Sequence, residues 1–84
     1  MKFSYKITAK SGLHGRAAAM IVNKCYEYKS TISIVYNGKI ANADSIVGIA
    51  GLGAKQGDVI NVIIDGEDEI LVYEELKLYL ENNL

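Results

Sequence analysis

The sequence predicts an α+β fold with two layers, an open-faced β-sandwich in which three helices cover one face of a four-stranded antiparallel sheet. Three observations predict it. Four segments alternate apolar and polar residues, the period of strands with one buried face. Three helical segments complete the order β-α-β-β-α-β-α, which fits a split βαβ motif. Half of the 84 residues are apolar, enough for the core of a single domain over residues 1–84.

The chain opens with a strand and a helix joined by a loop. Apolar and polar residues alternate over residues 2–8, which predicts a strand, and residues 9–13 form a loop. From Gly15 onward apolar residues recur at helical spacing, and this helix is expected to end near Tyr28. Cys25 lies on the apolar face of the helix, so we interpret it as a small core residue.

A β-hairpin is predicted next. Residues 32–36 alternate again, and residues 39–43 form the returning strand. Between them, Asn37-Gly38 is the strongest short signal for a hairpin, because both central residues of a type I′ turn need positive φ.

A short helix and a fourth strand follow the hairpin. Ser45 is the expected N-cap of a helix over residues 46–50, which breaks at Gly51 or Gly53. Residues 59–64 alternate, but their second face is also rather apolar. We therefore expect this strand in the centre of the sheet.

The last helix begins with three acidic residues, Glu67, Asp68 and Glu69, which are favourable against the positive end of the helix dipole. Its predicted core stripe consists of Val72, Tyr73, Leu76, Tyr79 and Leu80. Leu71 and Leu78 fall on the opposite side, where they are either single exposures or a surface for self-association.

Composition excludes several classes of function. A net charge of -1 offers no electrostatic footprint for nucleic acid, and no apolar run approaches the ~20 residues that span a bilayer. One cysteine excludes an internal disulfide and a multi-cysteine metal site, and residues 1–8 lack the apolar stretch of a signal peptide. We expect a cytoplasmic protein whose partners are proteins or small anions.

His14, the only histidine, stands where the first loop meets the first helix. A helix N-terminus presents backbone N–H groups without intrahelical partners, so Gly15, Arg16 and Ala17 are candidate donors to a phosphoryl group there. The Arg16 guanidinium adds a permanent positive charge. Imidazoles are largely neutral in the cytosol, which leaves a ring nitrogen free to attack phosphorus. A lone histidine is nevertheless more often structural than reactive.

Several blocks occur together in an order that is specific as a set. They are Gly12-Leu13-His14 with Arg16, Asn37-Gly38-Lys39 with Asn42, Ser45-Ile46-Val47-Gly48-Ile49, Leu52-Gly53-Ala54, Gly57, and Gly66-Glu67-Asp68-Glu69. In these blocks the chain resembles, over essentially its whole length, the histidine-containing phosphocarrier HPr of the bacterial sugar phosphotransferase system.

The resemblance implies a covalently phosphorylated carrier rather than a stand-alone enzyme. In that family enzyme I passes phosphate from phosphoenolpyruvate to the δ nitrogen of the histidine, here His14, which hands it to a sugar-specific IIA component. Arg16 would stabilise the phosphate, and the family uses no metal or organic cofactor. A monomer is expected. The family usually has alanine and proline at the positions of Gly15 and Ala17, so here the Ala17 N–H is present and Gly15 loosens the approach.

Ser45 is a second candidate site. In HPr proteins of many Gram-positive bacteria the matching serine is phosphorylated by an ATP-dependent kinase, which slows the relay and recruits a transcriptional regulator. The simpler interpretation is an N-cap that stabilises the short helix by roughly 1 kcal/mol. Asp44 precedes the serine and would repel a phosphate.

The resemblance also implies a docking surface near His14. It consists of Ala19, Met20, Ile46, Val47 and Ala50, an apolar patch that enzyme I and IIA would share in turn. Arg16 and Lys24 are expected to flank it.

The sequence therefore leaves three alternative functions open. The first is the phosphocarrier, and the second is a regulatory binding module of the same family that acts through protein contacts and is switched at Ser45. The third is a small-ligand or nucleic-acid module on a similar fold. This third function would need exposed aromatic residues on strands or a basic stripe, and the sequence has neither.

Overall fold

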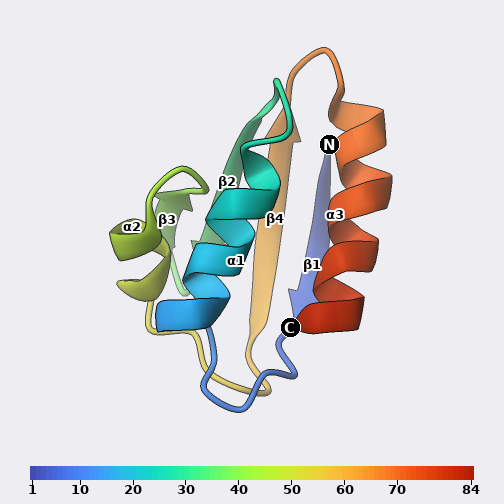
Figure 1. The fold of residues 1–84 in the computed structure, drawn as a ribbon. Coiled ribbons are helices and arrows are strands. Elements are labelled where there is room, and N and C mark those ends of the chain that lie inside the picture. Colours follow the sequence, from blue (N-terminus) through green and yellow to red (C-terminus); the bar gives the residue numbers. More distant parts are fainter.

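A computed structural model describes residues 1–84 and contains four strands and three helices in the predicted order (Figure 1). The elements are β1 (Lys2–Lys6), α1 (Gly15–Cys25), β2 (Thr31–Tyr36), β3 (Lys39–Asn42), α2 (Ile46–Ala50), β4 (Val59–Asp65) and α3 (Glu69–Asn83). The helices lie on one side of the sheet in Figure 1. The predicted fold class is confirmed.

The sheet has the strand order β1-β4-β2-β3, with every neighbouring pair antiparallel. β4 is central, as predicted, because Val62 pairs with Phe3 on one side and with Ile34 on the other. The apolar residues of its second face, Val59 and Ile63, are exposed at 52% and 37%. The face of the sheet opposite the helices is therefore open to solvent, and the central position comes from pairing rather than from burial on both sides.

The hairpin between β2 and β3 has the predicted turn. Asn37 has φ 51° and Gly38 has φ 79°, the positive values that a type I′ turn requires. Tyr36, at the end of β2, donates a hydrogen bond of 2.8 Å from its hydroxyl to the Asp58 carboxylate. This bond ties the hairpin to the turn that precedes β4.

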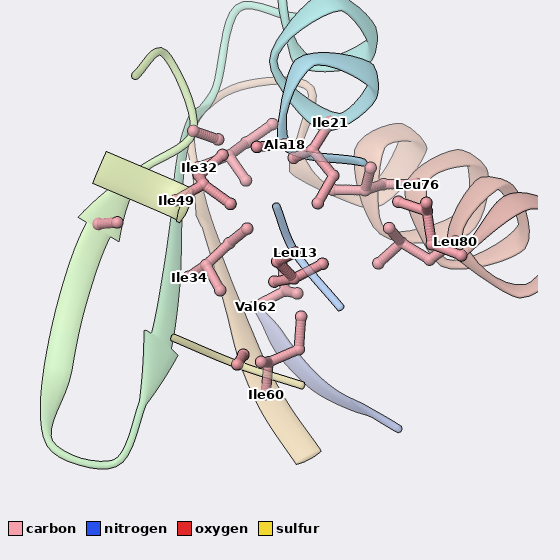
Figure 2. Close-up of a cluster of buried hydrophobic side chains, with 14 of the residues drawn as sticks. Leu13, Ala18, Ile21, Ile32, Ile34, Ile49, Ile60, Val62, Leu76 and Leu80 are labelled. Atoms are coloured by element: carbon pink, nitrogen blue, oxygen red, sulfur yellow. The ribbon is translucent and has the colours of Figure 1, made fainter. Parts of the chain in front are cut away.

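The core lies between the helices and the inner face of the sheet. Side chains from all three helices and from the inner strands point into one cluster in Figure 2, which includes Leu13, Ala18, Ile21, Ile34, Ile49, Ile60, Val62, Leu76 and Leu80. Cys25 packs at the edge of the core, and its burial raises the pKa of the thiol to about 12. The thiol thus stays neutral, as expected of a small packing residue.

The first helix is shorter than predicted. α1 ends at Cys25 rather than near Tyr28, because the last turn tightens into bonds from the Glu27 N–H to the Lys24 carbonyl and from the Tyr28 N–H to the Cys25 carbonyl. The Tyr28 side chain still packs on the core, and its hydroxyl donates a hydrogen bond of 2.8 Å to Glu75 of α3. The apolar spacing therefore continues past the end of the helix.

The last helix begins later than predicted, at Glu69. The Asp68 carboxylate accepts hydrogen bonds from the Lys29 N–H at 2.8 Å and the Ser30 N–H at 2.9 Å, and also from the Ser30 hydroxyl. Asp68 therefore holds the connection between α1 and β2 instead of capping α3. No helix combines the length and the apolar character that crossing a membrane requires.

We expect Asp68→Asn to reduce the free energy of unfolding at pH 7 and to have little effect near pH 2. The hydrogen bonds from Lys29 and Ser30 lower the pKa of the Asp68 carboxyl. A lowered folded-state pKa stabilises the protein above the ordinary pKa, and this stability is lost as pH falls through the folded value. Urea unfolding across this pH range measures the difference. Asp65→Asn, an exposed carboxylate without a side-chain hydrogen bond, is the control, and an equal effect of Asp68→Asn at both pH values would contradict the prediction.

Candidate functional site

The loop before His14 is held tightly on one side by the segment that follows α2. The Leu13 N–H donates a hydrogen bond of 3.1 Å to the Ala54 carbonyl. Gly12 has φ +67°, and a Cβ on it would overlap the Ala54 carbonyl oxygen and lie 2.8 Å from the Lys55 Cα. Only glycine allows this approach. The side chain of Leu13, 2% exposed, extends into the core.

The end of α3 holds the same loop on the other side. The Leu84 carbonyl accepts hydrogen bonds from the N–H groups of Thr8 at 2.8 Å and Ala9 at 2.7 Å, and its side chain is buried. Sequence reasoning missed this residue. The signal was present, because Leu84 continues the four-residue spacing of Leu76 and Leu80.

His14 is the N-cap of α1, with the extended dihedrals φ -101° and ψ 158°. Its backbone carbonyl accepts a hydrogen bond of 2.9 Å from the Ala17 N–H, whereas its imidazole is exposed and forms no hydrogen bond. The backbone and the side chain of His14 thus have different environments. The main chain caps the helix, and the exposed imidazole has no hydrogen-bond partner.

Two of the three predicted backbone donors are free. The N–H groups of Gly15 and Arg16 form no hydrogen bond, as expected for a first helical turn. The Ala17 N–H is already used by the His14 carbonyl, so the expectation that it is free for a phosphoryl group is corrected. Gly15 has φ +41°, and a Cβ there would meet nothing within 4 Å. Glycine is therefore favoured here by the backbone conformation and not by crowding.

An open hollow lies beside His14 and Arg16. Its lining comprises Ala9, Lys10, Ser11, Gly12, His14, Gly15, Arg16, Ala17, Met20, Asn82, Asn83 and Leu84. Lys10 and Arg16 are exposed and form no ion pair, and none of the lining side chains is acidic. The charged side chains of the lining are thus all basic, which suits an anion. Sequence reasoning missed Lys10, Asn82 and Asn83, which only the fold brings to this place.

The predicted docking residues lie on α1 and α2, the two helices that pack beside each other in Figure 1. Val47 is 83% exposed and Ile46 is 44% exposed, while Ala19, Met20 and Ala50 are half-buried. The two exposed residues of α2 therefore make the most prominent part of this patch.

Lys24 does not flank the patch, contrary to the prediction. Its side chain is only 19% exposed, its Nζ lies 3.3 Å from Glu27, and it sits over the rings of Tyr28 and Tyr79 at 5.6 Å and 5.5 Å. Because Tyr79 belongs to α3, these contacts draw the lysine away from α2. Arg16 is the cation that remains near the patch.

Ser45 is the N-cap of α2, as predicted. Its Oγ accepts a hydrogen bond of 2.9 Å from the Gly48 N–H, and the helix ends before Gly51. The neighbouring Asp44 is exposed, and its carboxylate has no ion-pair partner.

Comparison with known proteins gives a consistent picture. The family model described as the PTS HPr component phosphorylation site matches residues 1–82. Phosphocarrier protein HPr of Buchnera aphidicola is 47% identical over 75 residues, 89% of this chain and 88% of that protein. The crystal structure of HPr-C-His from Thermoanaerobacter tengcongensis is similar with a TM-score of 0.90 and 34% identity, covering 96% of this chain and 91% of that one.

A third similar protein differs in assembly. Crh, the catabolite repression containing protein of Bacillus subtilis, is 31% identical with a TM-score of 0.78, over 95% of this chain and 92% of that one. Its crystal structure is an intertwined dimer with a swapped domain. The fold therefore does not by itself support the expectation of a monomer.

Two glycine substitutions distinguish the cost of a left-handed backbone conformation from the cost of steric overlap in the loop around His14. We expect Gly15→Ala to lower the free energy of unfolding by about 1 kcal/mol, the cost of a left-handed residue with open space around it. Gly12→Ala should cost about 2 to 4 kcal/mol, because the same strain is added to overlap with the Ala54 and Lys55 backbone. Urea unfolding measures both. Equal losses would show that the loop does not need the close approach at Gly12.

Proposed function

The chain belongs to the HPr family of phosphocarrier proteins of the phosphotransferase system, and on this premise we propose that it is a phosphoryl carrier that uses His14. Phospho-enzyme I donates the phosphoryl group to His14, and His14 passes it to a sugar-specific IIA component in the cytoplasm during sugar uptake. One observation carries this proposal: the sole histidine is exposed at the start of α1, beside free N–H groups and Arg16.

The transfer uses groups that the site already presents. The lone pair of the δ nitrogen of neutral His14 attacks phosphorus, an N–P bond forms, and the bond to the donor atom of enzyme I breaks with its electron pair left on the donor. The free N–H groups of Gly15 and Arg16, and the Arg16 guanidinium, face the charge that arrives. The exchange with IIA repeats the step in reverse.

Moderate stabilisation of the phosphorylated state suits a phosphoryl carrier. The hollow beside His14 is open to solvent and offers exposed cations rather than a buried pocket. Exposed charges are screened by water, so they stabilise the phosphorylated state only weakly. A carrier with such a site can release its phosphoryl group to the next protein.

Incubation with enzyme I and phosphoenolpyruvate tests the proposal. We expect an acid-labile, base-stable phosphate on the protein and none on His14→Ala. Arg16→Ala should accept phosphate about tenfold more slowly, the equivalent of one charge-assisted hydrogen bond. Lys39→Ala, an exposed cation at the remote hairpin, is the control and should react at the normal rate. Label on His14→Ala, or no label on the unmodified chain with its own enzyme I, would refute the carrier function.

We also propose Ser45 as a regulatory phosphorylation site, which keeps the second function of a switched binding module open. The serine is half-exposed at the N-terminus of α2, next to the apolar residues Ile46 and Val47. A phosphate there would place negative charge in the middle of the proposed docking patch and so weaken the contacts with enzyme I and IIA. The similar protein Crh is a catabolite repression protein, which supports a regulatory branch of the family.

Incubation with ATP and the kinase that phosphorylates the matching serine of HPr proteins tests this second site. We expect one base-labile phosphate located on Ser45 by mass spectrometry, absent from Ser45→Ala, and slower transfer from enzyme I to His14 in the modified protein. Asp44→Asn should be phosphorylated faster, because it removes the adjacent like charge. Persistence of the label in Ser45→Ala would assign the phosphate to another residue.

A further inference from the structure

A second concave site lies at the end of α1 opposite to His14. It is a cavity of about 230 Å³ between the last turn of α1, the start of β2 and the segment after β3. Its lining comprises Val22, Cys25, Tyr26, Tyr28, Ser30, Thr31, Ile32, Asn42, Ala43 and Asp44. It shares no residue with the hollow beside His14. The carrier function therefore leaves this cavity without a role.

The cavity combines an apolar floor with one carboxylate, that of Asp44, at its edge. Val22, Ile32 and Ala43 form the buried part, whereas Asp44 is exposed and its carboxylate has no ion-pair partner. The C-terminal turn of α1 adds the negative end of the helix dipole at the same place. These features together favour a positive charge at the mouth of the cavity and methylene groups further inside.

No cation of this chain occupies the site. The lining contains neither lysine nor arginine. Lys24 is not part of the lining, although its Nζ, 3.3 Å from Glu27, lies over the rings of Tyr28 and Tyr79, and Lys29 forms an ion pair of 3.5 Å with Glu67. Asp44 is thus the one charged side chain of the lining, and it has no ion-pair partner within this chain.

Tyr26 decides which cation fits best. It is 75% exposed at the edge of the cavity, and its hydroxyl forms no hydrogen bond. A planar guanidinium can stack on an aromatic ring and present two parallel N–H donors to a carboxylate, whereas an ammonium group is a compact, strongly hydrated charge. An arginine stem also covers apolar surface while its charged end stays near water.

We propose that this cavity binds an arginine side chain of a partner protein, with the guanidinium between Asp44 and Tyr26 and the aliphatic stem against Val22 and Ile32. The site is a separate contact from the patch on α1 and α2. It would allow a partner to hold the domain without covering His14.

Titration of the ¹⁵N-labelled chain with N-acetyl-arginine amide tests the proposal, with N-acetyl-citrulline amide as the uncharged probe of the same shape. We expect saturable amide shifts at residues 25–31 and 42–44, with dissociation in the millimolar range typical of one isolated side chain. Citrulline should bind at least fivefold more weakly. Equal shifts with both probes, or shifts centred on α3 or on the hollow beside His14, would overturn the proposal.

Variants locate the binding groups. Asp44→Asn and Tyr26→Leu should each weaken arginine binding at least threefold, and both residues are exposed, so the fold should tolerate the changes. Glu74→Gln removes an exposed carboxylate from α3, outside the cavity lining, and should leave the affinity unchanged. Unaltered affinity in Asp44→Asn would refute the assignment. Phosphate transfer to His14 provides an independent readout and should be normal in all three variants.

Discussion

The burial of Leu13 is the constraint on which the geometry of the site depends. Leu13 is packed in the core, and the next residue, His14, has its ring in solvent. Because one peptide bond joins them, the core sets the position from which α1 begins. Burial of a leucine side chain stabilises a protein by about 1.5 to 3 kcal/mol, so the loop is held firmly without any contact to the imidazole. The ring of His14 can thus stay free of hydrogen bonds while its backbone is fixed.

Two distant segments complete this arrangement. The Ala54 carbonyl after α2 and the Leu84 carbonyl at the end of α3 both accept hydrogen bonds from the loop, and Gly12 permits the close approach to the first of them. The proposed docking helix α2 and the proposed phosphate site are consequently connected through a short, rigid stretch of backbone. A change at either anchor would alter the position of His14 without touching the ring.

The two ends of α1 have opposite electrostatic character. At its start, free N–H groups, Lys10 and Arg16 surround a hollow without acidic side chains. At its end, the carbonyl side of the helix meets Asp44 in a cavity without basic ones. The helix dipole has the same sign as the charged side chains that line each site, although Lys24 also lies in the last turn of the helix. One helix of 11 residues thereby connects the proposed phosphate site and the proposed cation site.

Local signals in the sequence determined the elements whose stability comes from near neighbours. The positive φ values of Asn37 and Gly38, the cap of Ser45 on Gly48 and the place of His14 at a helix start involve residues at most three apart. The order of these motifs was also sufficient to indicate the family, and with it the proposal for His14.

Only the tertiary structure decided the contacts between residues that are distant in the sequence. The Asp68 carboxylate binds Ser30, 38 residues away, instead of capping its own helix, and the Leu84 carbonyl binds the Thr8 N–H just after β1. Lys24 turns toward Tyr79 of α3 instead of the docking patch. A side chain with several accessible partners selects among them by distance and burial, which a sequence pattern does not contain and only the packed chain supplies.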